Sequence, residues 1–452
     1  MILLKKSSQF KIFLYTLWQI AGWSSLVARR AHNPEVAGSN PAPATNFQGK
    51  SMRLIKFILI IIISLMTFNC NNQDQALKQK AVSLSQKYII TDGHIDVPWR
   101  LHKGGYEDLS VRTLSGEFDY VRSKEGGLDA PFMSIYVPSS YQETGGAKEM
   151  AIELIDSVKR IANDHPDKFE VAYSTSDVER IFSEGKIALP MGMENGAPIE
   201  DNLKNIEFFY NQGIRYITLT HAKDNAICDS SYDTTGTHQG LSDFGKEVVR
   251  EMNRVGIMVD ISHVSDKAFY QVMEVTQVPA IASHSSCRHF TPDFERNMND
   301  DMIKRLAQNG GVIQINFGST FVTKDSQDKR NYNSELVAQF AKENNLNEGD
   351  EELIAYAKKI AEQNPIFCDV TDVADHFDHV VKLVGIDHVA FGSDYDGVGD
   401  SLPYGLKDVS SYPNLIYHLL KRGYSEEDIE KICYKNVWRV WNATQEFAKN
   451  SK

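Results

Sequence analysis

The sequence predicts one α/β domain built as a closed barrel of parallel strands, with helical insertions on its surface. Hydrophobic residues make up 42% of the 452 residues and charged residues 24%, a balance typical of a globular protein with a large core. From about residue 88 onward, short apolar runs alternate with segments of helical periodicity, which is the rhythm of a parallel βα sheet. Polar residues gather at the carboxyl ends of these runs, where a parallel barrel carries its chemistry.

Eight apolar runs are expected to be the strands of a TIM (β/α)8 barrel that spans residues 88–448. They cover residues 88–91, 132–137, 187–193, 216–220, 257–261, 280–283, 312–316 and 389–392.

Amphipathic helices are expected between the strands, at residues 148–163, 241–254, 266–275 and 300–309. Ser425 and Asp428 have the spacing of a capping box for a final helix that runs toward Asn442. Residues 331–365, rich in Glu, Asn and Lys, are expected to form a helical excursion on the surface.

The amino-terminal part is expected to direct export. Residues 52–70 have the basic start and short apolar core of a signal peptide, and Cys70 at their end resembles the lipidated cysteine of bacterial lipoproteins. We therefore expect an exported lipoprotein anchored on the periplasmic or cell-surface side, with plain cleavage or a retained membrane anchor as the alternatives. Residues 1–51 precede this signal and are expected not to belong to the mature protein, and residues 71–87 form a linker or first helix.

Charge and cysteine usage exclude several classes. The formal net charge is −12 and no basic stripe offsets it, which excludes a nucleic-acid partner. None of the five cysteines lies in a C-x-x-C pair, which excludes thiolate zinc ribbons and dithiol redox chemistry. Cys228 and Cys287 lie near the predicted open face of the barrel. They are expected either to form a disulfide or to remain two free buried thiols.

Five residues that can hold metal follow the predicted strands: His94, Asp96, Glu194, His263 and His284. His94 and Asp96 are two residues apart and can reach one ion, while His263 and His284, on neighbouring strands, can reach another. Glu194 has two oxygens with which to bridge them. Two bridged ions lower the pKa of a shared water toward about 7 and polarise a carbonyl, which is what amide hydrolysis needs. One histidine at a strand end is often only hydrogen-bonded to a loop, but five ligands together predict a binuclear metallohydrolase.

Six motifs carry a family resemblance. They are Asp92-Gly-His-Ile-Asp-Val-Pro-Trp99, Gly192-Met-Glu-Asn-Gly196, Arg215-Tyr-Ile-Thr-Leu-Thr-His221, Asp260-Ile-Ser-His-Val-Ser265, Ser283-His-Ser-Ser286 and Phe391-Gly-Ser-Asp-Tyr-Asp-Gly-Val398. In this order, over residues 92–442, the chain resembles the membrane (renal-type) dipeptidase family, zinc enzymes on a TIM barrel of the wider amidohydrolase group. The resemblance implies two Zn²⁺ per subunit, bridged by Glu194 and a water or hydroxide. It also implies a homodimer.

The resemblance further implies roles for residues that do not hold metal. His221 matches the histidine that contacts the substrate and stabilises the developing oxyanion, and Asp394 matches the acid that accepts the proton of the bridging water. Arg296 matches the arginine that pairs with the substrate carboxylate, and Arg288 is a possible substitute because the preceding loop departs from the family pattern. Asp396 is expected to support the turn rather than to hold metal.

We therefore expect a zinc-dependent dipeptidase that hydrolyses the single amide of a dipeptide, including one with a D-residue at its carboxyl end, through a bridging metal-bound water. One alternative is another binuclear amidohydrolase that acts on N-acyl amino acids or lactones. Removal of Arg296 should then matter little for a lactone. The other alternative is a non-catalytic anchored binding protein, against which Asp394 speaks, because a structural metal needs no unligated acid beside it. His376 and His379, three apart, are expected on a solvated helix face rather than at a metal.

Overall fold

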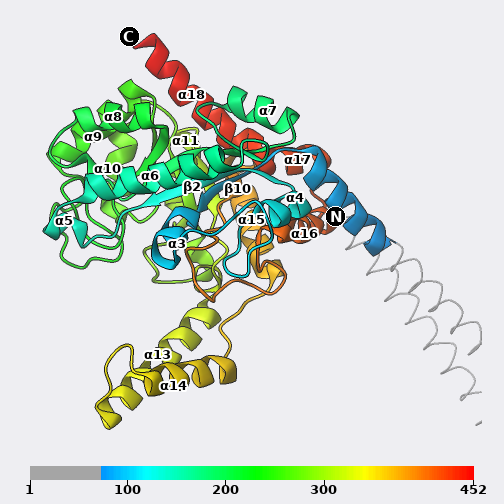
Figure 1. Ribbon diagram of the computed structural model, residues 1–452. Coiled ribbons are helices and arrows are strands. Elements are labelled where there is room, and N and C mark those ends of the chain that lie inside the picture. Colours follow the sequence, from blue (N-terminus) through cyan, green and yellow to red (C-terminus); the bar gives the residue numbers. More distant parts are fainter. Residues whose placement is uncertain (1–72, 452) are drawn as a thin grey trace, which may run out of the picture. The chain divides into compact units, whose positions relative to one another are not determined.

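Eight parallel strands close into a barrel (Figure 1). The computed structural model describes residues 73–451, so the predicted signal peptide, Cys70 and residues 1–51 lie outside the described residues. The strand order around the barrel is β1-β10-β9-β8-β7-β6-β5-β2. The strands are β1 (Ile90–Ile95), β2 (Leu128–Tyr136), β5 (Met191–Glu194), β6 (Ile214–Thr218), β7 (Met258–Asp260), β8 (Ile281–Ser285), β9 (Val312–Ile315) and β10 (Val389–Phe391). Each overlaps one of the predicted runs, and the TIM barrel is confirmed.

The run at residues 187–193 was predicted as one strand, and this prediction is wrong. The structure divides the run at Pro190 into β4 (Ile187–Leu189) and the barrel strand β5. Strand β4 instead pairs with the unpredicted β3 (Phe169–Val171) in a separate two-stranded sheet. Proline has no N–H for a sheet ladder, so the chain changes partners there, and the Pro190 carbonyl accepts a hydrogen bond from Met133 N at 2.8 Å.

Helices connect the strands and cover the barrel (Figure 1). Residues 73–87 are helical and precede β1. The others are α3 (Val97–Gly104), α4 (Tyr120–Gly126), α5 (Tyr141–Thr144), α6 (Ala147–Asp164), α7 (Thr175–Ser183), α8 (Lys204–Gln212), α9 (Asp243–Val255), α10 (Asp266–Val275), α11 (Asp300–Gln308), α12 (Ser319–Val322), α13 (Lys324–Asn344), α14 (Glu351–Gln363), α15 (Val370–Val384), α16 (Tyr412–Arg422), α17 (Glu426–Glu430) and α18 (Asn436–Asn450). The four helices predicted between strands are present as α6, α9, α10 and α11. Within residues 73–451, no helix is both long and apolar enough to span a bilayer.

The carboxyl-terminal helix α18 packs against the barrel near the amino-terminal end of β1. Ser425 caps α17 through the predicted capping box with Asp428, and a short π-helical segment, Lys431–Lys435, leads into α18. Trp438 Nε1 donates to Thr91 Oγ1 at 3.0 Å. The ring of the fully buried Trp441 lies 5.2 Å from that of Phe132. Because this packing is at the amino-terminal end of the barrel, the carboxyl ends of the strands remain available for the polar site.

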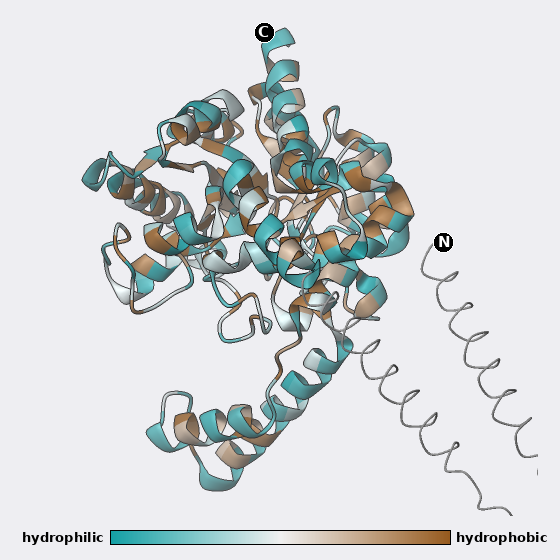
Figure 2. Cartoon of the chain, turned by 90° about the vertical axis from the view of Figure 1, so that its right-hand side faces the viewer, coloured by the Kyte–Doolittle hydropathy of each residue, from teal (hydrophilic) through white to brown (hydrophobic). Residues whose placement is uncertain are grey.

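Helices α13 and α14 form a hairpin that projects from the barrel (Figure 1). Phe340 and Tyr356 stack at 3.9 Å between the two helices, and Figure 2 shows hydrophilic residues along much of both helices. The hairpin confirms the helical excursion predicted for residues 331–365, although α13 begins earlier, at Lys324.

Candidate active site

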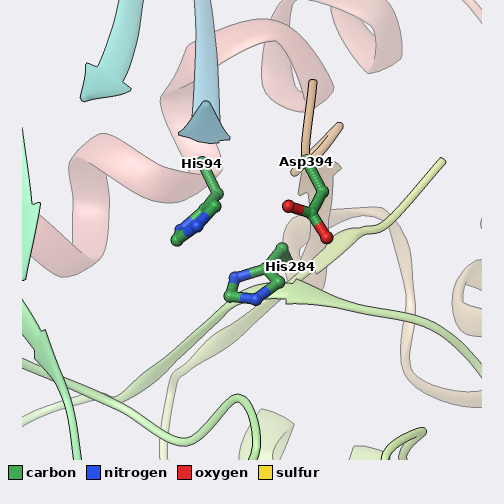
Figure 3. A group of neighbouring side chains, drawn as sticks. All are labelled: His94, His284 and Asp394. Carbon is green, nitrogen blue, oxygen red and sulfur yellow. The ribbon is translucent and has the colours of Figure 1, made fainter. Parts of the chain in front are cut away.

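The five predicted metal ligands converge at the carboxyl ends of the barrel strands. His94 lies one residue before the end of β1 and Asp96 directly follows that strand. Glu194 ends β5, His263 follows β7 and His284 lies in β8. All five are buried, with exposed fractions of 6% or less. Figure 3 shows the side chains of His94 and His284 next to that of Asp394, which follows β10.

Glu194 lies between two groups of ligands and turns one oxygen toward each. Its Oε2 is 3.4 Å from His94 Nε2, which is itself 3.4 Å from Asp96 Oδ2. Its Oε1 is 3.1 Å from His263 Nε2 and 3.3 Å from His284 Nε2. This is the division of ligands that the sequence predicts for two ions bridged by one carboxylate.

Hydrogen bonds behind the histidines set which ring nitrogen faces the site. Ser283 Oγ donates to Asp260 Oδ2 at 2.6 Å and lies 2.8 Å from His284 Nδ1, which therefore donates to it. His284 Nε2 is left as an acceptor that faces Glu194, and Tyr216 acts on His94 in the same way. Sequence reasoning missed Tyr216, Asp260 and Ser283. The signal was their position within the quoted motifs: Asp260 lies three residues before His263 and Ser283 directly before His284, while Tyr216 lies five residues before His221.

The charge states suit a cation. Burial alone would raise the pKa of Glu194, but the surrounding imidazoles of His94, His221, His263 and His284 hold it well below its usual range. Burial lowers the pKa of both His263 and His284 well below the usual value, which favours the neutral imidazoles that bind metal. Buried His94 Nε2 and Asp96 Oδ1 have no hydrogen-bond partner within the described residues, although buried polar atoms are normally satisfied. The donor set therefore fits a divalent cation such as zinc.

Asp394 lies at a tightly packed turn beside the ligands. Asn316 Nδ2 donates to its Oδ2 at 2.7 Å, and its backbone has the left-handed φ of 62°, which is uncommon for a non-glycine residue. Burial and the negative charges of Asp96 and Glu194 raise the pKa of Asp394 well above its usual value. Asp396 turns away, since its carboxylate accepts from Arg100 Nε at 3.1 Å and from Glu117 N at 2.8 Å.

A cavity of about 520 Å³ opens over the ligands. His221, which lines it, lies with its Nε2 3.7 Å from Glu194 Oε1 and its ring 4.2 Å from that of His263. Trp99, Tyr136 and Tyr232 also line the cavity. Such a volume is typical of a small-molecule site.

Of the two candidate arginines, Arg296 lies beside the ligands. Its Nη1 donates to Ser285 Oγ and its Nη2 to the His284 carbonyl, both at 2.8 Å, while its buried Nε has no protein partner among the described residues. Arg288 is instead held by Asp266, at 2.5 and 2.8 Å, on the outer side of the loop. The geometry therefore favours Arg296 over Arg288.

Two other expectations concern residues around the site. His376 is fully buried rather than solvated: it accepts from Cys287 N at 3.0 Å, and its Nε2 lies 3.0 Å from the Val322 carbonyl. The prediction of a solvated face is wrong for this residue, because its helix packs this side against the barrel loops. Burial lowers the pKa of His376 to about 4. Cys228 and Cys287 are buried free thiols, which decides the alternative left open by the sequence.

The sequence model described as "Membrane dipeptidase (Peptidase family M19)" matches residues 78–452, most of the chain. The chain belongs to the membrane dipeptidase family. This confirms the predicted family and enzyme class, a metallo-dipeptidase on a TIM barrel.

Relatives in the membrane dipeptidase family agree in sequence and in fold. The dipeptidase tcpJ of Claviceps purpurea is 34% identical over 375 residues, which are 80% of this chain and 78% of that protein. The crystal structure of the probable dipeptidase PvdM from Pseudomonas aeruginosa is 28% identical and has a TM-score of 0.72, covering 83% of this chain and 100% of that one. A metallo peptidase from Rhodobacter sphaeroides, liganded with a phosphinate mimic of the dipeptide L-Ala-D-Ala, is 23% identical with a TM-score of 0.64, covering 79% and 99%.

Proposed function

We propose that this membrane dipeptidase holds two zinc ions and hydrolyses dipeptides, including those with a D-residue at the carboxyl end. The observation that carries the proposal is the position of Glu194. One of its oxygens faces His94 and the other faces His263 and His284, so a single carboxylate serves two groups of ligands. Nitrogen and oxygen donors suit zinc, although they also suit other divalent ions, so the metal is to be identified by measurement.

His94, Asp96 and Glu194 would hold one ion, and Glu194, His263 and His284 the other. When bound, two such ions would lower the pKa of the attacking water and polarise the scissile carbonyl. The protein contributes the fixed orientation of the ligands, because Tyr216 and the Asp260–Ser283 pair hold the imidazoles from behind.

Asp394 would move the proton. Its Oδ2 accepts a hydrogen bond from Asn316. Its Oδ1 and Asp96 Oδ2 both lie beside Gly397, so the two carboxylates are close to each other. From there Asp394 can accept the proton of the attacking water and pass it to the leaving amine.

His221 and Arg296 would bind the substrate. His221 lies on the side of Glu194 next to His263, where an imidazole can stabilise negative charge that develops on the carbonyl oxygen. The free Nε of Arg296 can donate to the carboxylate of the substrate, and burial strengthens such a charge-assisted bond. Recognition of that carboxylate would favour a dipeptide over an amide that has the same amino-terminal residue but no free carboxylate.

Acceptance of a D-residue is supported by the Rhodobacter sphaeroides relative, which was liganded with a phosphinate mimic of L-Ala-D-Ala. It is also in keeping with the family resemblance of the six motifs. The cavity of about 520 Å³ is large enough for a dipeptide of either configuration.

The test uses the purified full-length protein, L-Ala-D-Ala, N-acetyl-alanine and a lactone, before and after chelation and zinc repletion. We expect dipeptide hydrolysis that is lost with the chelator and restored by zinc, and about two zinc ions per chain by elemental analysis. Hydrolysis of only the other two compounds would overturn the proposal in favour of another amidohydrolase activity.

We also propose that the protein is exported and anchored through a lipid on Cys70, and that it forms a homodimer. The basic start and apolar core of residues 52–70 support export and the anchor, and the family resemblance supports the dimer. Partition into detergent that is lost in Cys70→Ala would support the anchor, whereas unchanged partition would contradict it. Light scattering of the purified protein would show whether its mass is that of two chains.

A further inference from the structure

Arg330, on the projecting hairpin, reaches the active-site cavity. It lies in the second turn of α13, and it lines both the cavity over the metal ligands and an adjoining cavity of about 530 Å³. Tyr232 and Phe321 also line both cavities. The two spaces therefore meet at these three side chains.

An aromatic wall joins the ligands to Arg330. The ring of Tyr232 lies 5.9 Å from that of His263 on one side and 6.1 Å from that of Phe294 on the other. Phe294 in turn lies 5.8 Å from Phe321. A substrate side chain that extends from the reacting centre along this wall would bury its apolar stem and place its end beside Arg330.

The start of α13 is anchored, so Arg330 has a defined position. Thr323 caps the helix through Ser326 N at 3.2 Å, and Gln327 Nε2 donates to the Thr320 carbonyl at 2.8 Å. Arg330 Nη1 makes one long contact, 3.4 Å, with Thr320 Oγ1.

Arg330 forms no salt bridge with a carboxylate among residues 73–451. Its neighbours on α13 are paired: Lys324 with Asp328, and Lys329 with Asp325. Arg330 has no carboxylate within 4.0 Å among residues 73–451, although the chain as a whole carries a net charge of −12. A guanidinium at the edge of the cavity with free donors is suited to a carboxylate.

We propose that Arg330 is a specificity-determining residue that selects dipeptides with a second carboxylate, on an acidic side chain. The inference rests on the proposed dipeptidase function. Arg296, buried beside His284, would bind the carboxyl terminus of the substrate. Arg330, at the other end of the aromatic wall, would bind the carboxylate of the acidic side chain. The Arg296 guanidinium stands 5.4 Å from the ring of Phe321, which lines both cavities together with Arg330.

The test compares kcat/KM for acid and amide pairs at both substrate positions: L-Ala-D-Glu with L-Ala-D-Gln, and L-Glu-D-Ala with L-Gln-D-Ala. The native protein should prefer the acid at one position, and Arg330→Gln should reduce that acid-to-amide ratio about tenfold, mainly through KM. Lys329→Gln is the matched control, since it removes a neighbouring cation of the same helix, and it should leave the ratio unchanged.

The outcomes separate this inference from the function on which it rests. An acid-to-amide ratio that is the same in the native protein and in Arg330→Gln at both positions overturns the inference while the dipeptidase activity stands. An equal loss in Arg330→Gln and Lys329→Gln also overturns it, because the effect would then be one of overall charge. If the native protein hydrolyses none of these dipeptides or L-Ala-D-Ala, the proposed function fails and the inference fails with it.

Discussion

The hydroxyl of Tyr216 lies 2.8 Å from His94 Nδ1, inside the barrel and behind the proposed metal centre. The same hydroxyl donates to the Gly93 carbonyl at 3.1 Å, so it accepts the hydrogen of His94 Nδ1. His94 Nε2 is thereby left with its lone pair toward Asp96 and Glu194. A tyrosine far away in sequence thus holds the imidazole in the form that binds a cation.

Replacing Tyr216 with Phe should weaken metal binding without unfolding the protein. The phenyl ring would keep the contact with Phe132, at 5.3 Å, while the bond to His94 is lost. Loss of such a supporting bond typically costs about 10- to 100-fold in metal affinity. Competition with a chromophoric chelator measures the affinity, and the exposed Tyr270→Phe is the control. Unchanged affinity in Tyr216→Phe would show that the tautomer of His94 is set elsewhere.

Replacing Asp394 with Asn should stop proton transfer but keep the metals. The amide oxygen can still accept from Asn316 Nδ2, so the turn should be retained. We expect kcat to fall by roughly 10²- to 10⁴-fold, the contribution of a general acid–base group. Metal content measured on the same sample is decisive, because Asp394 also lies within 4.8 Å of ligand atoms of His94 and His284. A loss of one ion per chain would make Asp394 a ligand instead.

Gly397 should tolerate no side chain. A Cβ at this position would come within 2.2 Å of both Asp96 Oδ2 and Asp394 Oδ1, so Gly397→Ala must displace both carboxylates or the turn itself. A displacement of about 1 Å at a reacting centre can cost roughly 100-fold in rate, and we expect a loss of kcat/KM of that order. Gly104→Ala, where an added Cβ meets no atom within 4 Å, should retain activity and serves as the control. Full activity in Gly397→Ala would mean that the turn is free to move.

The positions of the strands were predictable because their apolar residues form continuous runs, which both faces of a buried parallel strand require. The metal ligands were predictable because they directly follow these runs, and parallel strands bring their carboxyl ends together. His94 and Glu194 are 100 positions apart in sequence but meet at 3.4 Å for this reason.

Other features depend on tertiary contacts that local patterns do not contain. The division at Pro190 depends on the presence of β3 as a partner for β4. His376 has charged neighbours in sequence, but Asp375 and Asp378 turn outward to Arg422 while the imidazole packs inward against Cys287 and Val322. Arg330 was overlooked because only the folded hairpin brings α13 to the cavity.

Stability should fall as pH rises from about 4 to about 7, in part because of Asp129 on β2. Burial raises the pKa of Asp129 from 3.8 to about 7, and the carboxyl accepts from Ile90 N at 3.2 Å. A carboxyl whose pKa is raised by folding binds its proton more tightly in the folded state. Its contribution to stability is therefore complete below pH 4 and is lost as the pH passes through about 7.

Asp129→Asn should make stability depend less on pH, because the amide cannot ionise and its oxygen can still accept from Ile90 N. The shift in pKa bounds the effect at roughly 4 kcal/mol, and we expect the loss of unfolding free energy between pH 5 and pH 8 to shrink by about 2 kcal/mol. Urea unfolding at both pH values, with saturating metal, measures it, and the exposed Asp156→Asn on α6 is the control. Some dependence should remain, since burial and the neighbouring Asp396 raise the pKa of Glu117 to about 8 and act in the same direction. An identical loss in the native protein and in Asp129→Asn would show that Asp129 does not take up a proton in this range.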